Sequence, residues 1–412
     1  MTPSSSTNQT IAVLFGGRSV EHEVSIITGH QIMDALEVAG FALLPIYIDK
    51  EGNWFAGTPL RNLKLYSKAG PLDLENLPNV QAVSFSADRS IRELIPHPKK
   101  SKSGIFSKPP KLWADVFLPA IHGATGEDGA IQGLFELADV PYIGCGILAS
   151  AVALHKATTK RVLASGGIPV LDYLTITRAQ WAADQTACLT AAEALNAYPL
   201  IVKPCSLGSS IGVSRASDRQ ELADAISLAL ELDDTALLER ALTDFFEINC
   251  AVRSNNGIST PSACELPCTS EQVLTFEEKY KRGGGKSGKG GTKGPGGVKG
   301  SPSAGMASLQ RIIPAPIPDE LTTQVQTYAS TAFQLINGAG VARIDFLFDK
   351  YSNQLFLNEI NTMPGSLAFY LWEATGLPFD QLVTSLVAEA QARHRQRQST
   401  RHRFDANLLF RS

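Results

Sequence analysis

The sequence contains Leu357-Asn358-Glu359-Ile360-Asn361-Thr362-Met363-Pro364-Gly365 and, shortly before it, Val341-Ala342-Arg343-Ile344-Asp345-Phe346. Both stretches alternate polar with apolar side chains, and in a β-strand every second side chain lies on the same face. We therefore expect Glu359 and Asn361 to share one face of a strand, as do Arg343 and Asp345. If the strands pair through a turn at residues 349–353, all four polar side chains meet on a single patch.

This patch predicts a metal site. Two carboxylates held close together repel each other unless a cation lies between them. Oxygen ligands from Asp345, Glu359 and Asn361 suit a hard ion such as Mg²⁺, which usually keeps several waters and completes its shell with substrate phosphates. A solvated hairpin face without a ligand is the alternative, and these residues alone leave it open.

Length and composition indicate an ordinary multidomain globular protein. The chain has 412 residues, of which 44% are hydrophobic and 19% charged, and this length favours two or three domains. A net charge of −3 gives no global reason to expect nucleic acid or an anionic membrane as partner. Residues 1–10 lack the pattern of a signal peptide, and no apolar run reaches the ~18 residues of a membrane span. We expect a cytoplasmic protein with reduced cysteines.

The N-terminal part predicts a parallel, doubly wound sheet. Strand patterns alternate with helical ones, and the predicted strands are residues 11–15, 41–48, 116–121 and 142–144. Ligands of such sheets lie beyond the carboxyl ends of the strands, where Glu21 falls, although Glu21 could only cap its helix. His122, in the loop before a predicted helix at 130–138, could hold that loop or touch a substrate. Residues 57–111 read as an irregular insertion with one possible strand at 80–85.

The middle of the chain predicts a phosphate-binding hairpin. A helix is expected over residues 148–163, followed by a strand at 199–204, a Gly/Ser-rich loop and a second strand. Lys203 would supply positive charge beside that loop. The loop sequence Gly208-Ser209-Ser210-Ile211-Gly212 also fits the nucleophile elbow of serine hydrolases, but that motif requires a helix after the serine, and here a strand follows.

A long segment near residue 290 predicts a lid. Residues 282–307 are dominated by Gly, Lys, Ser and Pro and cannot bury enough apolar surface to hold themselves folded. A mobile, cationic segment suits closure over a polyphosphate, and a plain flexible linker is the alternative. The Arg-rich tail, residues 394–412, is expected to be disordered.

Six motifs, in order along residues 11–393, resemble those of the D-alanine–D-alanine ligases in the ATP-grasp superfamily. They are residues 16–25 (GGRSVEHEVS), 122–129 (HGATGEDG), 203–204 with 207–212 (KP and LGSSIG), 278–280 (EKY), 342–345 (ARID) and 358–365 (NEINTMPG). The resemblance implies an α/β ATP-grasp fold, α+β in the nucleotide-binding part. It implies a Rossmann-like domain at 1–147, a central domain at 148–238 and a C-terminal domain at 239–393 with a lid at about 277–308. ATP would lie between the last two domains.

The resemblance also implies a role for each matching residue. ATP contacts are implied for Lys156, Lys203, Glu239, Glu247 and Lys279. Two Mg²⁺ (or Mn²⁺) ions would be held by Asp345, Glu359 and Asn361. The catalytic positions would be Glu21, Ser209, Tyr280, Arg343 and Gly365. Substrate contacts are implied for Glu21, His122, Ser366 and Leu367.

The implied reaction joins two D-alanines through a D-alanyl phosphate, for peptidoglycan synthesis, in a homodimeric enzyme. Relatives that make an ester with D-lactate often carry His where this chain has Tyr280, so a dipeptide is favoured. The alternatives are a sister ligase with D-serine, D-lactate or another second substrate, and a nucleotide-binding protein without catalysis. The chain departs from the family in having His155 before Lys156, a longer lid, and a shorter segment after Gly365.

Overall fold

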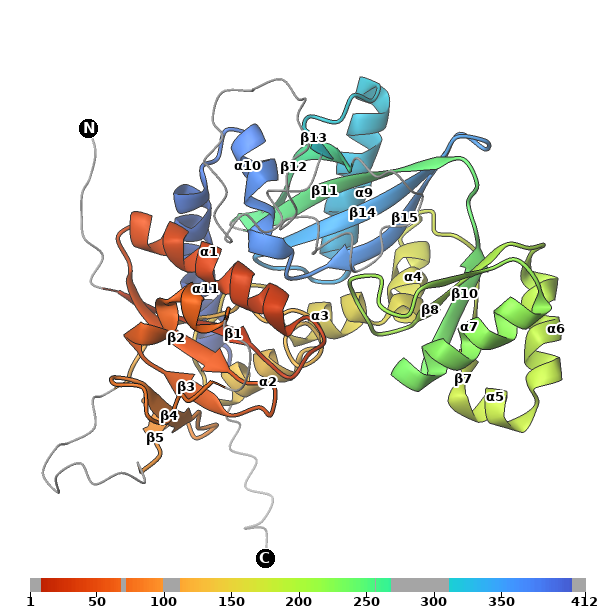
Figure 1. Cartoon of the computed structure of the whole chain (residues 1–412). Coiled ribbons are helices and arrows are strands. Elements are labelled where there is room, and N and C mark those ends of the chain that lie inside the picture. The colour runs from red at the N-terminus through yellow and green to blue at the C-terminus, as the bar shows by residue number, and fades with distance from the viewer. Residues whose placement is uncertain (1–8, 68–71, 99–111, 256, 268–310, 402–412) are drawn as a thin grey trace, which may run out of the picture.

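Three β-sheets organise the chain in a computed structural model that describes residues 9–67, 72–98, 112–255, 257–267 and 311–401. Figure 1 shows the N-terminal sheet in red and orange, a small central sheet in yellow and green, and a C-terminal sheet in green and blue. The strand orders are β5-β4-β3-β2-β1-β6, β7-β10-β8-β9 and β13-β12-β11-β14-β15.

The N-terminal sheet has the expected parallel centre. Its strands β1 (Thr10–Gly16), β2 (Ala42–Ile48) and β6 (Val116–Pro119) are parallel neighbours. The side chains on the two faces of β1 belong to two different apolar clusters. Helix α1 (His22–Val38) contributes to the cluster on one face, and helix α2 (Ala130–Leu137) contributes to the cluster on the other. The sheet is therefore covered on both sides, as a doubly wound sheet requires.

The possible strand at residues 80–85 is confirmed as β4 (Gln81–Ser84), which pairs antiparallel with β3 (Trp54–Ala56). Two other expectations for this sheet were wrong. The insertion contributes a further strand, β5 (Ile95–Pro96), which pairs with β4. Residues 142–144 form no strand and make one isolated bridge, between Tyr142 and Phe117. A short apolar run that packs against a sheet has the same sequence pattern as a strand within it.

The helix expected over residues 148–163 is two helices, α3 (Ile147–Leu154) and α4 (Lys156–Ser165). They meet at His155, whose Nδ1 accepts the Thr158 N–H at 3.2 Å and caps α4. An N-cap residue leaves the helical conformation in order to satisfy such an N–H. His155, a departure from the family pattern, thus serves as the cap directly before Lys156.

The central sheet keeps a core of its own. Its strands are β7 (Tyr173–Thr177), β8 (Leu200–Pro204), β9 (Ser214–Ala216) and β10 (Thr235–Arg240), and its helices are α5 (Arg178–Ala183), α6 (Gln185–Leu195) and α7 (Arg219–Leu232). Strands β8 and β9 pair antiparallel, so the predicted hairpin is confirmed. All the buried residues of its main apolar cluster come from this part of the chain.

The C-terminal sheet is antiparallel throughout. It contains β11 (Phe245–Asn255), β12 (Ile258–Pro267), β13 (Arg311–Ile312), β14 (Val341–Asp349) and β15 (Gln354–Asn361). Helix α9 (Asp319–Leu335) buries one face of it, through Val325, Ala329 and Phe333. The opposite face carries the polar residues described below.

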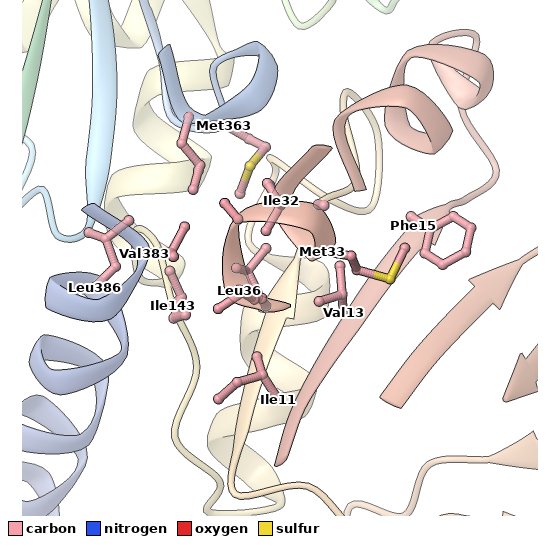
Figure 2. Packing of buried hydrophobic residues seen from close by; sticks show 14 of the residues in the cluster. Ile11, Val13, Phe15, Ile32, Met33, Leu36, Ile143, Met363, Val383 and Leu386 are labelled. Atoms are coloured by element: carbon pink, nitrogen blue, oxygen red, sulfur yellow. The ribbon is translucent and has the colours of Figure 1, made fainter. Parts of the chain in front are cut away.

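The chain ends in a turn, η5 (Gly365–Ala368), and helices α10 (Phe369–Ala374) and α11 (Phe379–Ser399). Helix α11 packs against α1, and both belong to the cluster that fills one face of the N-terminal sheet. Figure 2 shows Val383 and Leu386 of α11 facing Leu36 of α1 and Ile143. The first and last domains therefore share a core.

The tail prediction was wrong for residues 394–399, which belong to α11. His394 contacts the carbonyl of Asp139 at 2.9 Å, and Arg393 donates to the carbonyls of Tyr142 and Gly144 at 2.8 and 2.9 Å. These contacts with the N-terminal domain hold the polar end of the helix in place. Residues 402–412 lie outside the described chain. No helix among the described residues is long and apolar enough to cross a membrane.

If α11 shares the N-terminal core, replacing Leu386 by Ala should lower the free energy of unfolding by about 2–5 kcal/mol, because Leu386 is buried and its removal leaves a cavity. Urea denaturation measures the change. Leu137→Ala is the control, since this leucine is 65% exposed and its loss should cost less than about 0.5 kcal/mol. Equal effects of the two substitutions would contradict the shared core.

Candidate functional site

The β14–β15 hairpin has the register that the sequence predicts. Arg343 lies opposite Asn361, and Asp345 lies opposite Glu359, so all four side chains occupy one face of the sheet. A β-bulge between Asp345 and Phe346 adds Asn358 to that face. Bulges re-aim side chains in this way, and period-2 alternation alone misses them.

Arg343 and Asp345 form a buried bidentate pair. The Nε and Nη2 atoms of Arg343 donate to the two carboxylate oxygens of Asp345 at 2.6 and 2.5 Å. Burial opposes the charge of Arg343, but the neighbouring carboxylate of Asp345 outweighs it and raises the pKa of the guanidinium. Arg343 therefore provides a fixed positive charge at the centre of the sheet face.

A cavity lies between the central and C-terminal sheets. Its lining comes from β8, β10 and the β8–β9 loop on one side and from β11, β14 and β15 on the other. The polar residues that line it include Lys156, Lys203, Arg215, Glu239, Arg240, Glu247, Asn358 and Glu359. Leu171, Ile201, Leu242 and Leu347 give it apolar walls. Four residues expected to contact ATP therefore share one cavity.

Glu239 is buried between two lysines at this cavity. It pairs with Lys203 and, at 3.0 Å, with Lys160. Burial alone would raise the pKa of Glu239, but the charges of Lys203 and Lys160 and their hydrogen bonds hold it at about 2. Lys203 also donates to Asn358 Oδ1 at 3.1 Å, which links β8 to the bulge on β15.

Lys156 fixes the β8–β9 loop. Its backbone N–H donates to the Cys205 carbonyl at 2.8 Å, and its Nζ donates to the Leu207 carbonyl. The same Nζ lies 3.9 Å from a carboxylate oxygen of Glu359. The lysine thus joins the loop to the predicted metal ligands.

The side chain of Glu21 does not cap its helix. It stands at the N-cap position of α1 but makes no capping hydrogen bond there, and Ser209 Oγ of the β8–β9 loop donates to its carboxylate. Glycines allow two loops to reach it. A Cβ at Gly123, where φ is +74°, would lie 2.7 Å from Glu21 Oε2, and one at Gly208 would lie 3.3 Å from the same atom. A side chain at Gly123 would displace the carboxylate.

Glu127 joins the N-terminal domain to the hairpin end. Its two oxygens accept the backbone N–H groups of Gly123 at 2.7 Å and Met363 at 3.0 Å. Burial raises its pKa to about 8, with a further contribution from the nearby charge of Glu21. Glu127 lies within the motif at residues 122–129, but no role was predicted for it from the sequence.

His122 holds its own loop. Its Nε2 contacts Thr28 Oγ1 at 2.9 Å, and its backbone N–H donates to Ser25 Oγ at 2.9 Å. Burial and, to a smaller extent, the charge of Arg343 lower its pKa to about 4, so the ring is neutral near pH 7. Of the two roles left open by the sequence, these contacts favour holding the loop, close enough to Arg343 to feel its charge.

The turn after Gly365 is strained. Ser366, Leu367 and Ala368 all have left-handed backbone angles, with φ of 50°, 58° and 50°, and all are buried. This conformation costs residues other than glycine roughly 1–2 kcal/mol each, so the surroundings must hold it. Ser366 contacts α1 through Thr28 and Gln31.

The predicted site residues therefore gather in one region, with two exceptions. Lys279 and Tyr280, together with the lid, lie outside the described residues. Lys160, Asn358 and Gln31 were not predicted as site residues. Lys160 lies four residues after Lys156 on one helix face, a spacing that could have revealed it. Asn358 faces the cavity because of the bulge, and Gln31 reaches Ser366 through packing between distant parts of the chain, so the periodicity of the sequence indicates neither.

No cluster of three or more His, Cys, Asp or Glu that could bind a metal occurs within the described ranges. The predicted set has a different composition, with two carboxylates and an amide on one sheet face. This donor set still fits a hard cation that takes its remaining ligands from phosphate and water. Each carboxylate oxygen also has more than one lone pair, so the pairing of Asp345 with Arg343 leaves room for a cation.

Family models match most of the chain. The model described as D-ala D-ala ligase N-terminus matches residues 10–145, and the one described as D-ala D-ala ligase C-terminus matches residues 162–289 and 304–388. The D-alanine–D-alanine ligase of Heliobacterium modesticaldum is 36% identical over 395 residues, which cover 95% of this chain and 96% of that protein. The corresponding ligase of Thermosipho africanus is 33% identical, with 97% and 98% covered.

Solved structures of similar fold belong to ligases of the same kind. The D-alanine–D-alanine ligase from Coxiella burnetii has a TM-score of 0.73 and 27% identity, covering 95% of this chain and 96% of that one. The VanG D-Ala:D-Ser ligase from Enterococcus faecalis also has a TM-score of 0.73 and 27% identity, with 93% and 100% covered. The expected resemblance and the α/β ATP-grasp fold are confirmed.

The raised pKa of Glu127 predicts a pH effect on stability. A carboxyl whose pKa rises on folding takes up a proton, so its contribution to stability falls as the pH rises from about 4.5 to about 8. The Glu127→Gln variant has no carboxyl here to lose a proton. The unfolding free energy of the wild type minus that of the variant should therefore decrease between pH 4.5 and about pH 8, by at most about 1.4 kcal/mol per pH unit.

Urea denaturation at pH 5, 6, 7 and 8 measures this effect. The exposed Glu231, replaced by Gln, is the control and should follow the wild type. A constant difference between wild type and Glu127→Gln across the pH range would contradict the raised pKa.

Proposed function

We propose how the residues of this chain, which belongs to the D-alanine–D-alanine ligase family, carry out the reaction of that family. The enzyme is an ATP-dependent ligase that joins two D-alanines into D-alanyl-D-alanine for peptidoglycan synthesis. The observation that carries the proposal is the register of β14 and β15. It places Arg343, Asp345, Glu359 and Asn361 on one face, and Glu359 also lines the cavity between the central and C-terminal sheets.

ATP binds in the cavity between the central and C-terminal sheets. Lys156 and Lys203 contact its phosphates, while Glu239 lies near the adenine and Glu247 binds the ribose. Support comes from the shared cavity lining and from the lysine charges, which Glu239 balances only in part. Lys279, which lies outside the described residues, is assigned to the phosphates by resemblance.

Asp345, Glu359 and Asn361 hold two Mg²⁺ or Mn²⁺ ions. When bound, these ions neutralise phosphate charge as the γ-phosphoryl group is transferred. The register supports this assignment, because it brings two carboxylates and an amide together on one sheet face and hard cations prefer oxygen ligands of this kind.

The first step forms the acyl phosphate. A carboxylate oxygen of the first D-alanine attacks the γ-phosphorus, the bond from that phosphorus to the bridging oxygen breaks, and ADP leaves. Glu21 binds the ammonium group of this D-alanine. The buried carboxylate between Gly123 and Gly208 supports that role, since it presents negative charge where two loops close.

The second step forms the peptide bond. The amine nitrogen of the second D-alanine attacks the acyl carbon, the carbon–oxygen bond to phosphate breaks, and phosphate leaves while the nitrogen loses its proton. Arg343 and the Gly365 N–H stabilise the oxyanion of the tetrahedral intermediate. Ser366 and Leu367 hold the second D-alanine, and His122 positions the loop beside Arg343.

Closure of the lid protects the intermediate. Ser209, Tyr280 and Glu21 form a hydrogen-bonded group that excludes water, which would otherwise hydrolyse the acyl phosphate. The bond from Ser209 to Glu21 supports the part of this group that lies in the described chain.

As part of the same proposal, the enzyme acts in the cytoplasm as a homodimer, with neither nucleic acid nor membrane as partner. The net charge of −3 supports the absence of a polyanionic partner. The resemblance supports the dimer.

Product analysis tests the function directly. Purified protein with ATP, Mg²⁺ and D-alanine should give D-alanyl-D-alanine with one ADP released per dipeptide, as measured by mass spectrometry. D-serine, D-lactate and L-alanine are added in competition, since a D-Ala:D-Ser ligase is among the similar structures. A dominant D-alanyl-D-serine product would favour the sister activity, and ATP binding without any coupled product would overturn both.

Glu359→Gln should lower kcat by about 100-fold, because it removes one of the two carboxylates that face the transferred phosphoryl group. The Mg²⁺ concentration for half-maximal rate should rise, and Mn²⁺ binding in the presence of ADP, followed by electron paramagnetic resonance, should weaken. Glu231→Gln serves as the control. A near-normal rate with unchanged Mn²⁺ binding would rule out the metal assignment.

A further inference from the structure

Helix α1 carries a buried polar stripe. Ser25, Thr28 and Gln31 follow one another at three-residue spacing, which places them on neighbouring positions of one helix face. Ser25 and Thr28 are almost completely buried. Polar side chains in a helix core cost stability unless they are hydrogen-bonded, so their partners show what the stripe is for.

The partners lie in two loops of the proposed active site. Ser25 accepts the His122 N–H at 2.9 Å, and Thr28 Oγ1 contacts His122 Nε2 at 2.9 Å. Thr28 also accepts the Ser366 N–H at 3.4 Å, and the hydroxyl of Ser366 donates to Gln31 Oε1. The end of the stripe nearest Glu21 therefore holds the His122 loop, and the far end holds the turn after Gly365.

This turn needs external support. Three consecutive residues without a glycine, Ser366, Leu367 and Ala368, have left-handed backbone angles, which L side chains rarely adopt. Within the turn, the Leu367 N–H donates to the Pro364 carbonyl at 2.8 Å. Strained backbone at a functional site persists only when surrounding contacts over-determine it.

We propose that Thr28 and Gln31 are positioning residues for the second substrate. They act through Ser366 to hold the left-handed turn, and the turn aims the Gly365 N–H and Ser366 at the attacking amino acid. Since Glu21 begins the same helix, α1 fixes the distance between the sites of the first and second D-alanine. This inference rests on the proposed function of Gly365 and Ser366.

The proposal predicts that the two chemical steps respond differently to Gln31→Ala. Formation of D-alanyl phosphate, trapped as the hydroxamate with hydroxylamine, should change by less than about two-fold, because Glu21 and the ATP cavity are untouched. Dipeptide formation should lose about ten-fold in kcat/KM for the second D-alanine, since the turn then samples other conformations. Gln31→Glu keeps the length and an acceptor oxygen, and it should restore most of this loss.

Hydrogen exchange gives a readout that does not depend on turnover. Peptides spanning residues 361–371 should exchange about ten-fold faster in Gln31→Ala than in the wild type, while those of the central sheet should not change. Gln398→Ala is the matched control. Like Gln31, Gln398 makes a hydrogen bond between the N-terminal and C-terminal parts of the chain, to Asp139 at 3.4 Å, but it does not contact Ser366. It should leave both steps and the exchange of the turn unchanged.

Three results would overturn the inference. Unchanged exchange of the turn in Gln31→Ala would show that this residue does not hold it. Faster hydrogen exchange of the turn with an unchanged rate of dipeptide formation would show that Gln31 has only a structural role. An equal loss of rate in acyl-phosphate formation and in dipeptide formation would show the same. If the wild type forms no dipeptide at all, the proposed function fails and the acceptor role fails with it, while the exchange result still decides whether Gln31 holds the turn.

Discussion

The antiparallel register of β14 and β15 is the constraint on which the rest of the site depends. Ile344, Phe346, Leu357 and Ile360 are buried in the apolar cluster to which α3, α4 and α9 contribute, so the opposite face must carry Arg343, Asp345, Glu359 and Asn361. A slip of one residue would turn every charged side chain into the apolar layer. Burial on one side of the sheet thus fixes the chemistry on the other.

Charge changes sign along this surface. At the nucleotide end, Lys160 and Lys203 pair with Glu239, and Lys156 lies 3.9 Å from Glu359. Three lysines thus face two carboxylates, and this positive charge suits a polyphosphate. At the other end, Glu21 and Glu127 lie close enough for one carboxylate to raise the pKa of the other. That end suits a cationic group such as the ammonium of an amino acid. Arg343 stands between the two regions, neutralised in its resting state by Asp345.

The three sheets are joined in different ways. Helices α1, α10 and α11 contribute to one apolar cluster that joins the N-terminal sheet to the C-terminal part of the chain. The main apolar core of the central sheet is separate, and the sheet reaches the site through polar contacts such as Ser209 with Glu21 and Lys203 with Asn358. The central sheet therefore meets the site through polar contacts, whereas an apolar core joins the other two sheets.

The sequence by itself determined the hairpin and the family. Period-2 alternation placed the four polar side chains of the hairpin on one face, and the six motifs identified the ligase family, because spacing within a strand or loop is a local property. Only the tertiary structure decided three further features. These are the position of Asn358 on the polar face, the contact of Glu127 with Met363, and the contacts of α1 with Ser366. The bulge depends on pairing between strands, and the other contacts join residues more than 200 positions apart. Such contacts arise from packing between domains, and periodicity along the chain contains no information about them.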